Sequence, residues 1–303
     1  MKVSICMITY NHESFIEQAI DSIIQQETNF DFELIIGEDY SKDNTRKIIE
    51  QYCERYPNIK LIDRGKNVGS TFNFIDTLDR ATGEYVSMMD GDDYMLPGKL
   101  QKQVDFLDAH PEVVMVGHQM NLLDGNTNTI TKVFDVPFIK ERYSIEDFIA
   151  KGTLFANSSK MFRRSSWPNY LHNYKIHYIA DYYVSMNIIG SHLAAFIPEV
   201  LGVYRIHPGG LMQNMKGRET NEDISTIQLS MHDLFDGMYD HLFNRLRSYG
   251  KMMYGIDEIK RRNFSLGRQM LLSSIKECWN FAPSRYLYLL LSYLPFLLPK
   301  KKS

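Results

Sequence analysis

The sequence predicts an α/β protein with a mostly parallel central sheet flanked by helices, followed by a helical C-terminal extension. Two observations carry this prediction. Within residues 1–90, short apolar runs rich in β-branched residues alternate with segments whose apolar residues recur at helical spacing. Such alternation is typical of strand–helix–strand units in a parallel sheet. From Glu222 onward the spacing stays helical, which predicts a second region built from helices alone.

Four strands are predicted where short apolar runs end in polar residues or glycine. They cover Val3–Ile8, Glu33–Gly37, Ile59–Ile62 and Tyr85–Met89. Runs this short have the length of strands, because helices usually need about ten residues or more. Since a helix separates each strand from the next, we expect the four strands to run in parallel.

The three connecting helices are recognised by their apolar spacing and their end signals. Apolar residues from Phe15 to Ile24 recur three and four positions apart, and Thr71–Arg80 has a similar pattern. Asn44–Tyr56 is amphipathic and is followed by Pro57, which cannot continue a helix. We expect these helices to cover the two faces of the sheet.

The later part of the chain contains weaker patterns for both kinds of element. Helices are predicted at Leu100–Ala109, Ile145–Lys151 and Tyr182–Ile189, and strands at Val113–Val116 and Leu201–Ile206. Residues 122–137 are rich in Asn, Thr, Asp and Gly, which favours a loop or a hairpin.

Bulk composition excludes several classes of function. The net charge of -3 over 303 residues provides no basic surface for nucleic acid. Cys6, Cys53 and Cys278 are far apart, so neither a zinc site nor a disulfide is expected. Polar residues from Thr9 onward interrupt the first apolar run too early for a signal peptide, and no apolar run reaches the ~18 residues of a spanning helix. A cytoplasmic protein is therefore expected.

Three polar clusters directly follow predicted strands. They are Thr9–His12, Glu38–Asp43 and Asp90–Asp93. Because ligands of parallel sheets bind beyond the carboxyl ends of the strands, we expect the three clusters to converge on one binding site.

The third cluster is a candidate metal site. Asp90, Asp92 and Asp93 place three carboxylates within four residues, and Gly91 lets the turn bend. Like charges so close together are costly unless a cation compensates them. Mn²⁺ or Mg²⁺ would accept carboxylate oxygens together with substrate phosphates. The alternative is a solvated turn in which an aspartate caps the helix that begins near Lys99.

The first two clusters each allow a binding role and a structural role. Asp39 can accept a hydrogen bond from a nucleotide base, whereas Ser41 or Asp43 fits the cap of the helix from Asn44. Thr9–Asn11 can hold a planar base or form a turn at the end of the strand. Neither Gly-x-Gly-x-x-Gly nor Gly-Lys-Ser/Thr follows the first strand, so binding of a nucleotide through acids and a metal is the remaining option.

The order of these motifs resembles the inverting glycosyltransferases of family 2, specifically their bacterial surface-polysaccharide members. The matching segments are Ser4–Asn11, Ala19–Gln26, Glu33–Asp43, Asn67–Gly69 with Asn73 beyond it, and Met89–Asp93. The resemblance implies a GT-A fold over residues 1–215. Residues 1–118 would form its Rossmann-like half that binds the nucleotide sugar, and residues 119–215 the half that binds the acceptor.

The resemblance also implies roles for individual residues. The donor, a UDP-sugar or a dTDP-sugar, would contact Thr9, Tyr10, Asn11, Glu38, Asp39, Asn67, Gly69, Asp90, Gly91, Asp92 and Arg205. Mn²⁺ or Mg²⁺ would be held by Asp92, Asp93 and His207. Two positions depart from the family pattern. Glu38 stands where Asp is common, and Tyr40 stands where Gly, which suits a left-handed turn, is common.

A catalytic base is implied as well, because the acceptor hydroxyl must lose its proton in an inverting transfer. In the family an acidic pair begins a late helix, and Ile179–Tyr183 matches this pattern with a single acid, Asp181. The resemblance therefore implies that Asp181 is the base. Considered without the family, Asp181 fits the cap of the helix that follows.

The remaining expectations concern the product and the C-terminal part of the chain. The Gln-x-x-Arg-Trp motif of processive synthases does not occur, so transfer of a single sugar is expected. Residues 216–303 are predicted to be helical. Within them, residues 285–302 combine an apolar run, tyrosines and flanking bases, a pattern typical of peripheral contact with an anionic membrane. A helix packed on the domain or a dimer contact is the alternative.

A membrane contact would suit a lipid-linked saccharide acceptor on the inner face of the plasma membrane, in capsule, O-antigen or exopolysaccharide synthesis. Two other functions stay open on the residues alone. One is a sugar nucleotidyltransferase, which would normally show a glycine-rich phosphate loop near the first strand. The other is a non-catalytic protein that binds a nucleotide sugar or a membrane.

Overall fold

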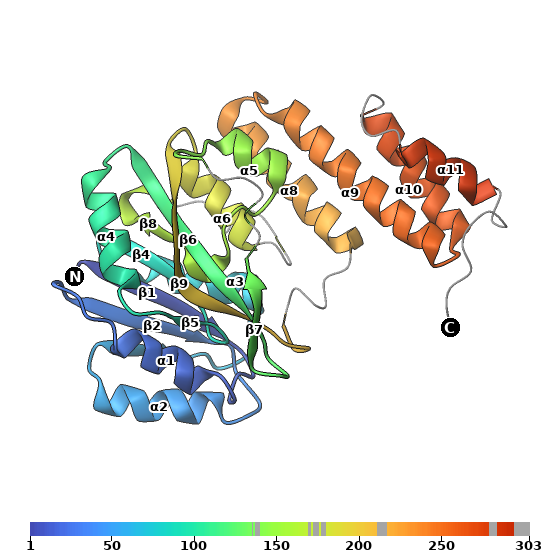
Figure 1. The fold of residues 1–303 in the computed structure, drawn as a ribbon. Helices are drawn as coiled ribbons and strands as arrows, with labels where there is room; N and C mark the ends of the chain where they lie inside the picture. The colour runs from blue at the N-terminus through green and yellow to red at the C-terminus, as the bar shows by residue number, and fades with distance from the viewer. Residues whose placement is uncertain are drawn as a thin grey trace. The chain divides into compact units, whose positions relative to one another are not determined.

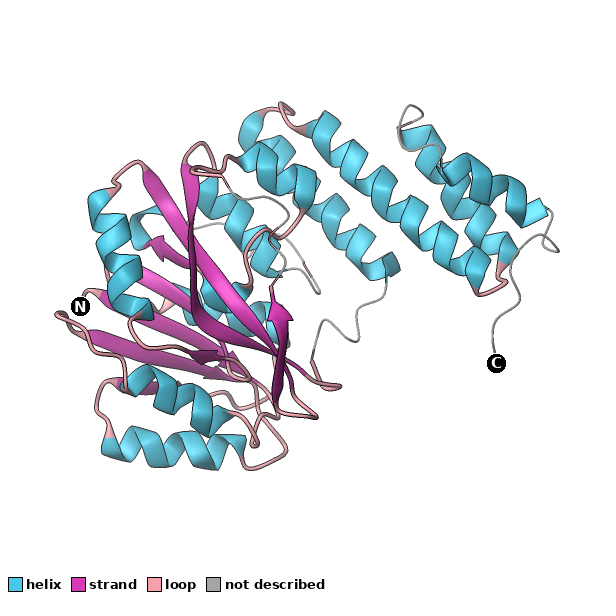
Figure 2. Ribbon diagram, viewed as in Figure 1, coloured by secondary structure: helices cyan, strands magenta, loops and turns pink. Residues whose placement is uncertain are grey.

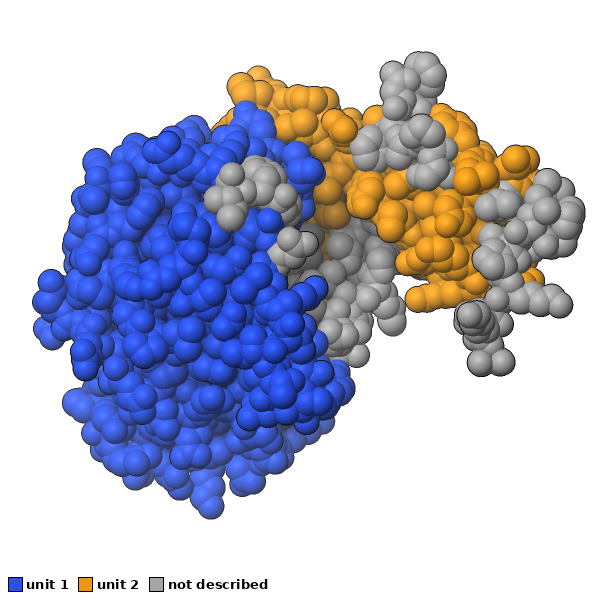
Figure 3. All heavy atoms as spheres, viewed as in Figure 1, with its two compact units in different colours: residues 1–173, 179–214 blue, residues 174–178, 215–303 orange. Residues whose placement is uncertain are grey.

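The structure is a computed structural model that describes residues 1–134, 136, 140–168, 171, 176, 180–210, 217–278 and 284–293. The chain divides into two compact units (Figure 3). Unit 1 consists of residues 1–173 and 179–214, and unit 2 of residues 174–178 and 215–303. Unit 1 contains the sheet, and the described elements of unit 2 are helices (Figures 1 and 2).

Unit 1 is built on one sheet with the strand order β3-β2-β1-β4-β8-β6-β9-β5, and β7 pairs with β6. The first four strands are β1 (Val3–Thr9), β2 (Phe32–Glu38), β3 (Ile59–Ile62) and β4 (Tyr85–Asp90). They pair with one another only in parallel, as predicted. Because β2 and β4 lie on opposite sides of β1, the strand order reverses there, and ligands bind at such a reversal.

Helices cover both faces of these strands. Side chains of α1 (Ile16–Ile24), α2 (Thr45–Arg55) and α4 (Lys99–Ala109) form one core cluster with Ile5 and its neighbours on the sheet. Figure 1 shows α1 and α2 side by side along this face. For these three helices and the four strands, most of the observed ends lie within one or two residues of the predicted ends.

The opposite face carries α3 (Ser70–Asp79), which lies very close to β2. A Cβ atom on Gly37 would come within 2.1 Å of the Thr77 hydroxyl and 2.5 Å of the Asn73 side chain. Asn73 also donates a hydrogen bond to the Gly37 carbonyl at 2.7 Å. Glycine at this position is therefore required for the helix to dock on the sheet.

The second half of the sheet, for which the sequence predicted no strand direction, contains both parallel and antiparallel pairs. β6 (Val113–Asp124) and β9 (Leu193–Ile206) pair in parallel and extend well beyond the predicted Val113–Val116 and Leu201–Ile206. Register shifts accompany the polar pair His118 and Gln119, so the strand continues through residues that break the apolar pattern.

Three short strands complete the mixed half. β8 (Met161–Arg163) is antiparallel to both β4 and β6, and β5 (Tyr94–Met95) is antiparallel to β9. Neither was predicted, because two or three residues are too few to show a period. β7 (Thr129–Val133) forms a hairpin with β6, one of the two alternatives expected for residues 122–137, of which 135 and 137 lie outside the described residues.

Two helices flank this half of the sheet. α5 (Ile145–Lys151) begins with a capping box in which the Ser144 amide donates to the Asp147 carboxylate at 2.9 Å. α6 (Ala180–Ile189) is buried along most of its length, and Asp181 lies in its first turn. Both helices agree with the predicted ranges.

Unit 2 contains α8 (Gly217–Phe235), α9 (Asp240–Lys260), α10 (Phe264–Glu277) and α11 (Ser284–Tyr293). The helical spacing predicted from Glu222 onward is confirmed. Met252, Ile256, Ile259 and Leu271 form a small core between α9 and α10. Among the helices that the structure describes, none is both long and apolar enough to cross a membrane. Residues 294–302 of the predicted membrane-interface segment lie outside the described residues.

Candidate active site

Most of the predicted site residues end or follow β1, β2 and β4 at the carboxyl edge of the parallel strands. Thr9 connects the three strand ends. Its carbonyl oxygen accepts a hydrogen bond from the Asp39 amide at 3.0 Å, and its hydroxyl lies 3.1 Å from His12 Nδ1. A Cβ atom on Gly91 would lie 2.7 Å from both Cβ and Oγ1 of Thr9. The acidic turn can approach β1 this closely only because residue 91 is glycine.

Asp39 organises one side of this site. Its carboxylate is buried and accepts hydrogen bonds from the main-chain amides of Val68 at 2.7 Å and Gly69 at 3.0 Å. Asn67 donates its side-chain amide to the Asp39 carbonyl at 2.8 Å. The structure thus brings together Asp39, Asn67 and Gly69, three residues that the sequence assigned to one nucleoside site. Each carboxylate oxygen keeps a second lone pair for a ligand.

The loops after β1 and β2 are joined by hydrogen bonds. Asn11 donates its amide to the Ser41 hydroxyl and accepts from the Lys42 amide, both at 2.9 Å. Asn11 and Tyr40 adopt left-handed backbone conformations, with φ of 54° and 61°. The left-handed turn is therefore kept although Tyr40 replaces the usual glycine. Tyr10 is 38% exposed at the same edge.

Glu38 and Asp43 also take part in these loops. Glu38 is buried, and its Oε1 accepts a hydrogen bond from the Ser41 amide at 2.6 Å, whereas Oε2 is buried without a partner. Asp43 accepts from the amide and the hydroxyl of Thr45 at 3.0 and 2.6 Å. This contact at the start of α2 agrees with the structural role considered for Asp43.

The three aspartates after β4 differ in their electrostatics. Burial and the neighbouring charge of Asp92 raise the pKa of Asp90 to about 7. Burial and the charges of both neighbours raise the pKa of Asp93 well above its usual value. Burial acts in the same direction on Asp92, but the hydrogen bond from His207 and the charges of His12 and His207 together outweigh it and lower the Asp92 pKa. Asp92 is therefore the member of the cluster most strongly held in the charged form.

Asp93 is engaged within the protein. One carboxylate oxygen accepts from the Ser158 hydroxyl at 2.6 Å, and the other accepts from the Arg205 amide at 2.9 Å. The Lys99 side chain is fully buried nearby and donates to the Ser158 carbonyl at 2.9 Å. Ser158 belongs to a short 3₁₀ helix, η1 (Asn157–Ser159). These contacts fix the turn and leave the metal-ligand role expected for Asp93 without geometric support.

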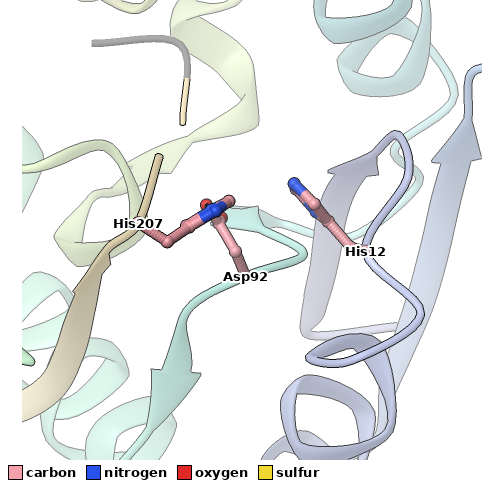
Figure 4. A group of neighbouring side chains, drawn as sticks. All are labelled: His12, Asp92 and His207. Carbon is pink, nitrogen blue, oxygen red and sulfur yellow. The ribbon is translucent and has the colours of Figure 1, made fainter. Parts of the chain in front are cut away.

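His12, Asp92 and His207 instead form a group suited to hold a metal ion (Figure 4). One candidate ligand atom of each residue lies within 4.8 Å of the others. His207 Nε2 and Asp92 Oδ2 are 3.0 Å apart. Burial lowers the pKa of His12, which favours the neutral imidazole that metal ligation requires. The sequence placed Asp92 and His207 in the metal site but did not include His12.

Arg205 supports the acidic turn rather than pointing freely into the site. Its guanidinium donates to the Asp92 carbonyl at 2.9 Å and to Gln18 at 2.6 Å, and it lies 4.7 Å from the centre of the Phe15 ring. With its main-chain bond to Asp93, Arg205 ties β9 to the turn after β4. The bonds to Asp92 and Gln18 use two of the five N–H donors of the guanidinium, so the donor contact expected for Arg205 stays a prediction.

Asp181 lies near the acidic turn. Its charge contributes to the raised pKa of Asp90, whereas the charge of Lys160 opposes that rise. The Lys160 ammonium donates to Asp181 Oδ2 at 3.1 Å. The Lys160 side chain is completely buried, whereas that of Asp181 is 26% exposed. An accessible carboxylate is thus held in place by a buried cation.

Several residues of this site escaped sequence reasoning. Asn157 donates to Asp90 at 2.9 Å, and Ser158 donates to Asp93 and accepts from the Asp90 amide at 3.0 Å. Burial raises the pKa of Tyr204, and the charges of Asp93, Asp90, Asp92 and Asp181 raise it further. Tyr204 therefore lies close to the whole acidic cluster. His12 was visible as part of a polar strand end, and Tyr204 stood directly before the segment with Arg205 and His207, whereas Lys160 carried no sequence pattern.

Comparison with known proteins shows to which protein family the chain belongs. Residues 4–168 match the model of the family described as glycosyl transferase family 2. The chain belongs to this family, and the expectation from its motifs is confirmed.

Particular relatives are found in bacteria. The chain is 35% identical over 216 residues to an uncharacterized protein of Mycobacterium tuberculosis, covering 69% of this chain and 60% of the relative. It is 35% identical over 167 residues to the putative glycosyltransferase EpsE of Bacillus subtilis, covering 55% and 58%. The chain thus spans about 60% or less of the length of these curated relatives.

A solved structure of S. aureus TarS in complex with UDP-GlcNAc has a similar fold. The TM-score is 0.70 at 19% identity, with 95% of this chain and 84% of that chain covered. This similarity concerns the fold alone and confirms the expected GT-A type architecture with additional C-terminal helices.

Proposed function

We propose that this chain is an inverting glycosyltransferase that moves one sugar from a UDP-sugar or dTDP-sugar to an acceptor hydroxyl. The observation that carries the proposal is the group His12, Asp92 and His207, placed next to the nucleoside-binding candidates around Asp39 in a chain of glycosyl transferase family 2. Acidic and imidazole ligands beside a base-binding carboxylate suit a nucleotide diphosphate better than a free sugar.

The residues present fit a divalent metal. One carboxylate and two imidazoles offer three ligand atoms within 4.8 Å of one another, and the Thr9 hydroxyl lies 3.1 Å from His12 Nδ1, where it can orient the ring. Nitrogen ligands suit Mn²⁺ better than Mg²⁺, which prefers oxygen. When bound, such an ion neutralises charge on the departing diphosphate.

The protein groups would divide the remaining work among them. Asp39, held by the amides of Val68 and Gly69, would accept a hydrogen bond from the base. Asp181 would take the proton of the acceptor hydroxyl as the hydroxyl attacks the sugar from the face opposite the diphosphate. Lys160, buried and bonded to Asp181, would keep that carboxylate directed into the site.

The proposed biological role is a step in bacterial surface-polysaccharide synthesis. It is supported by relatives such as EpsE and by a putative teichuronic acid biosynthesis glycosyltransferase of Bacillus subtilis, which is 34% identical over 105 residues. The UDP-GlcNAc complex of TarS supports a UDP-sugar donor. We propose a saccharide acceptor carried on a lipid, which requires contact with a membrane.

The test is a donor screen that measures release of nucleoside diphosphate with Mn²⁺ or Mg²⁺, using saccharide acceptors with and without a lipid carrier. We expect turnover with a UDP-sugar or dTDP-sugar, greater activity with Mn²⁺ than with Mg²⁺, and loss of activity in EDTA. Analysis of the product anomer by NMR tests inversion. Unchanged turnover in EDTA would remove the metal from the proposal, and donor binding without any transfer would favour a non-catalytic binding protein.

A further inference from the structure

The outer face of α11 is apolar and exposed. Leu287, Leu290 and Tyr293 are 56%, 57% and 59% exposed, and Tyr286 is 45% exposed. Tyr286, Leu287, Leu290 and Tyr293 are one, three and three residues apart in turn, which places them along one side of the helix. Two leucines and two tyrosines therefore form a continuous stripe on α11, which we call the α11 stripe.

The opposite side of α11 already holds the helix in place. Tyr288 and Leu289 pack against the core formed by Met252, Ile256, Ile259 and Leu271. Ser292 is 3% exposed, and its hydroxyl donates to the Leu289 carbonyl at 2.5 Å. These inward residues anchor α11, and Leu287 and Leu290 of the α11 stripe stay exposed on the other side.

The sequence on either side of α11 is basic. Residues 257–303 contain nine Lys or Arg and three Asp or Glu, a net charge of +6, whereas the whole chain carries -3. Two cations contact rings of α11 directly: the Arg268 guanidinium lies 4.7 Å from the centre of the Tyr293 ring, and the Lys260 ammonium lies 5.9 Å from that of Tyr288. Lys300, Lys301 and Lys302 follow α11 in the sequence.

We propose that the α11 stripe rests on the surface of an anionic lipid bilayer. Leucines would enter the boundary between head groups and acyl chains, tyrosines would lie at head-group depth, and the basic residues would be attracted to anionic lipid. The charge selects this occupant over a second copy of the chain, because two stripes facing each other would bring two basic regions together. The ten residues of α11 are too few to cross the bilayer.

The experiment is co-sedimentation of the full chain with vesicles of phosphatidylcholine alone or mixed with phosphatidylglycerol. One variant combines Leu287→Asn with Leu290→Asn. Its matched control combines Leu229→Asn with Leu234→Asn, two exposed leucines of α8. A third variant replaces Lys300, Lys301 and Lys302 by glutamine. Circular dichroism and thermal unfolding check that each variant is folded.

We expect binding to the anionic vesicles only, weakened as salt rises. The α11 double variant should bind at least about tenfold more weakly, and the α8 control should bind like the wild type. The lysine variant should lose on the order of a hundredfold, since each basic residue near the surface strengthens binding about fivefold.

Three results would overturn the inference. They are equal binding of the wild type to neutral and anionic vesicles, failure to bind either kind, and full binding by a folded α11 double variant. Light scattering without vesicles tests the remaining alternative. A dimer that the α11 substitutions dissociate would show that the α11 stripe is a contact between copies of the chain, and this result would also overturn the inference. None of these results depends on sugar transfer, so the inference and the proposed activity can fail separately.

Discussion

Buried carboxylates lie at both ends of the parallel strands, and their surroundings differ. Glu33 at the amino end is fully buried, and it accepts hydrogen bonds from Ser4, Thr82 and Lys60, each at 2.6 Å. Burial alone would raise its pKa, but these bonds outweigh burial and lower the pKa to about 2. The charge of Glu33 is therefore satisfied within the protein.

The aspartates at the carboxyl end have the opposite character. The pKa values of Asp90 and Asp93 are raised by burial and by neighbouring carboxylates, and Asp92 is charged beside them. Ionising this cluster costs free energy that the surrounding side chains do not fully offset. The comparison teaches that the acid at one end stabilises the fold, whereas the acids at the other end carry an electrostatic cost that the proposed metal ion would offset.

The largest expected effect is that of Asp92→Asn. It should lower kcat/KM on the order of 10⁴-fold, because the group His12, Asp92 and His207 loses its charged member. Mn²⁺ binding, measured by calorimetry, should be lost as well. The melting temperature in EDTA should change little, because the substitution removes both the favourable contact with His207 and a charge that repels Asp90 and Asp93. A variant that loses stability in EDTA but keeps its Mn²⁺ affinity would show that Asp92 supports the fold and does not hold the metal, and the contrast between the two ends would disappear.

Next in size is Asp181→Asn, which should lower kcat on the order of 10³-fold by removing the proposed base. Binding of the nucleotide sugar should stay within about twofold of the wild type. Lys160→Met is the companion variant. It should lower kcat by about tenfold, because Asp181 loses the bond that directs it, while KM for the donor stays unchanged. Normal turnover of folded Asp181→Asn would exclude Asp181 as the base.

Glu33→Gln should act on stability instead of activity. A lowering of the pKa from 4.5 to about 2 corresponds to about 3 kcal/mol of stability. Since the folded-state pKa is the lower one, this contribution is present above pH 4.5 and is lost as the pH falls toward 2. Urea unfolding at pH 7 should show the loss, and the variant and wild type should converge near pH 2.

The control for Glu33→Gln is activity per folded molecule, which should match the wild type at a temperature where both are folded. A large loss of kcat at full folding would mean that the amino end of the sheet contributes to the reaction after all, and the contrast between the two ends would disappear.

The smallest expected effect is that of Tyr40→Gly. Tyr40 has a φ of 61°, a conformation that costs a non-glycine residue on the order of 1 kcal/mol. Glycine should therefore raise the free energy of unfolding by up to about 1 kcal/mol in urea. Because Tyr40 is 52% exposed, little packing is lost. A destabilised variant would show that the tyrosine side chain makes the carboxyl-end loop more rigid.

Much of the fold followed from the sequence because its first half is locally encoded. Four strands and three helices were predicted from runs and spacings that each occupy a single segment. The prediction was poorer from residue 113 onward. There β6 and β9 continue through polar residues such as His118 and Gln119, because each strand is completed by pairing with the other. β5 and β8 are too short to be recognised without their partners.

By itself the sequence determined the α/β class, the edge at which the site lies and most of its acidic residues, since strand-end motifs depend on local order along the chain. Only the tertiary structure decided which side chains each of those acids contacts. It joined Asp92 to His12 and His207, engaged Asp93 with Ser158 and Arg205, and placed Lys160 on Asp181. The reason is physical: the charge of a carboxylate depends on groups within a few ångströms, and here these groups come from segments far apart in the chain.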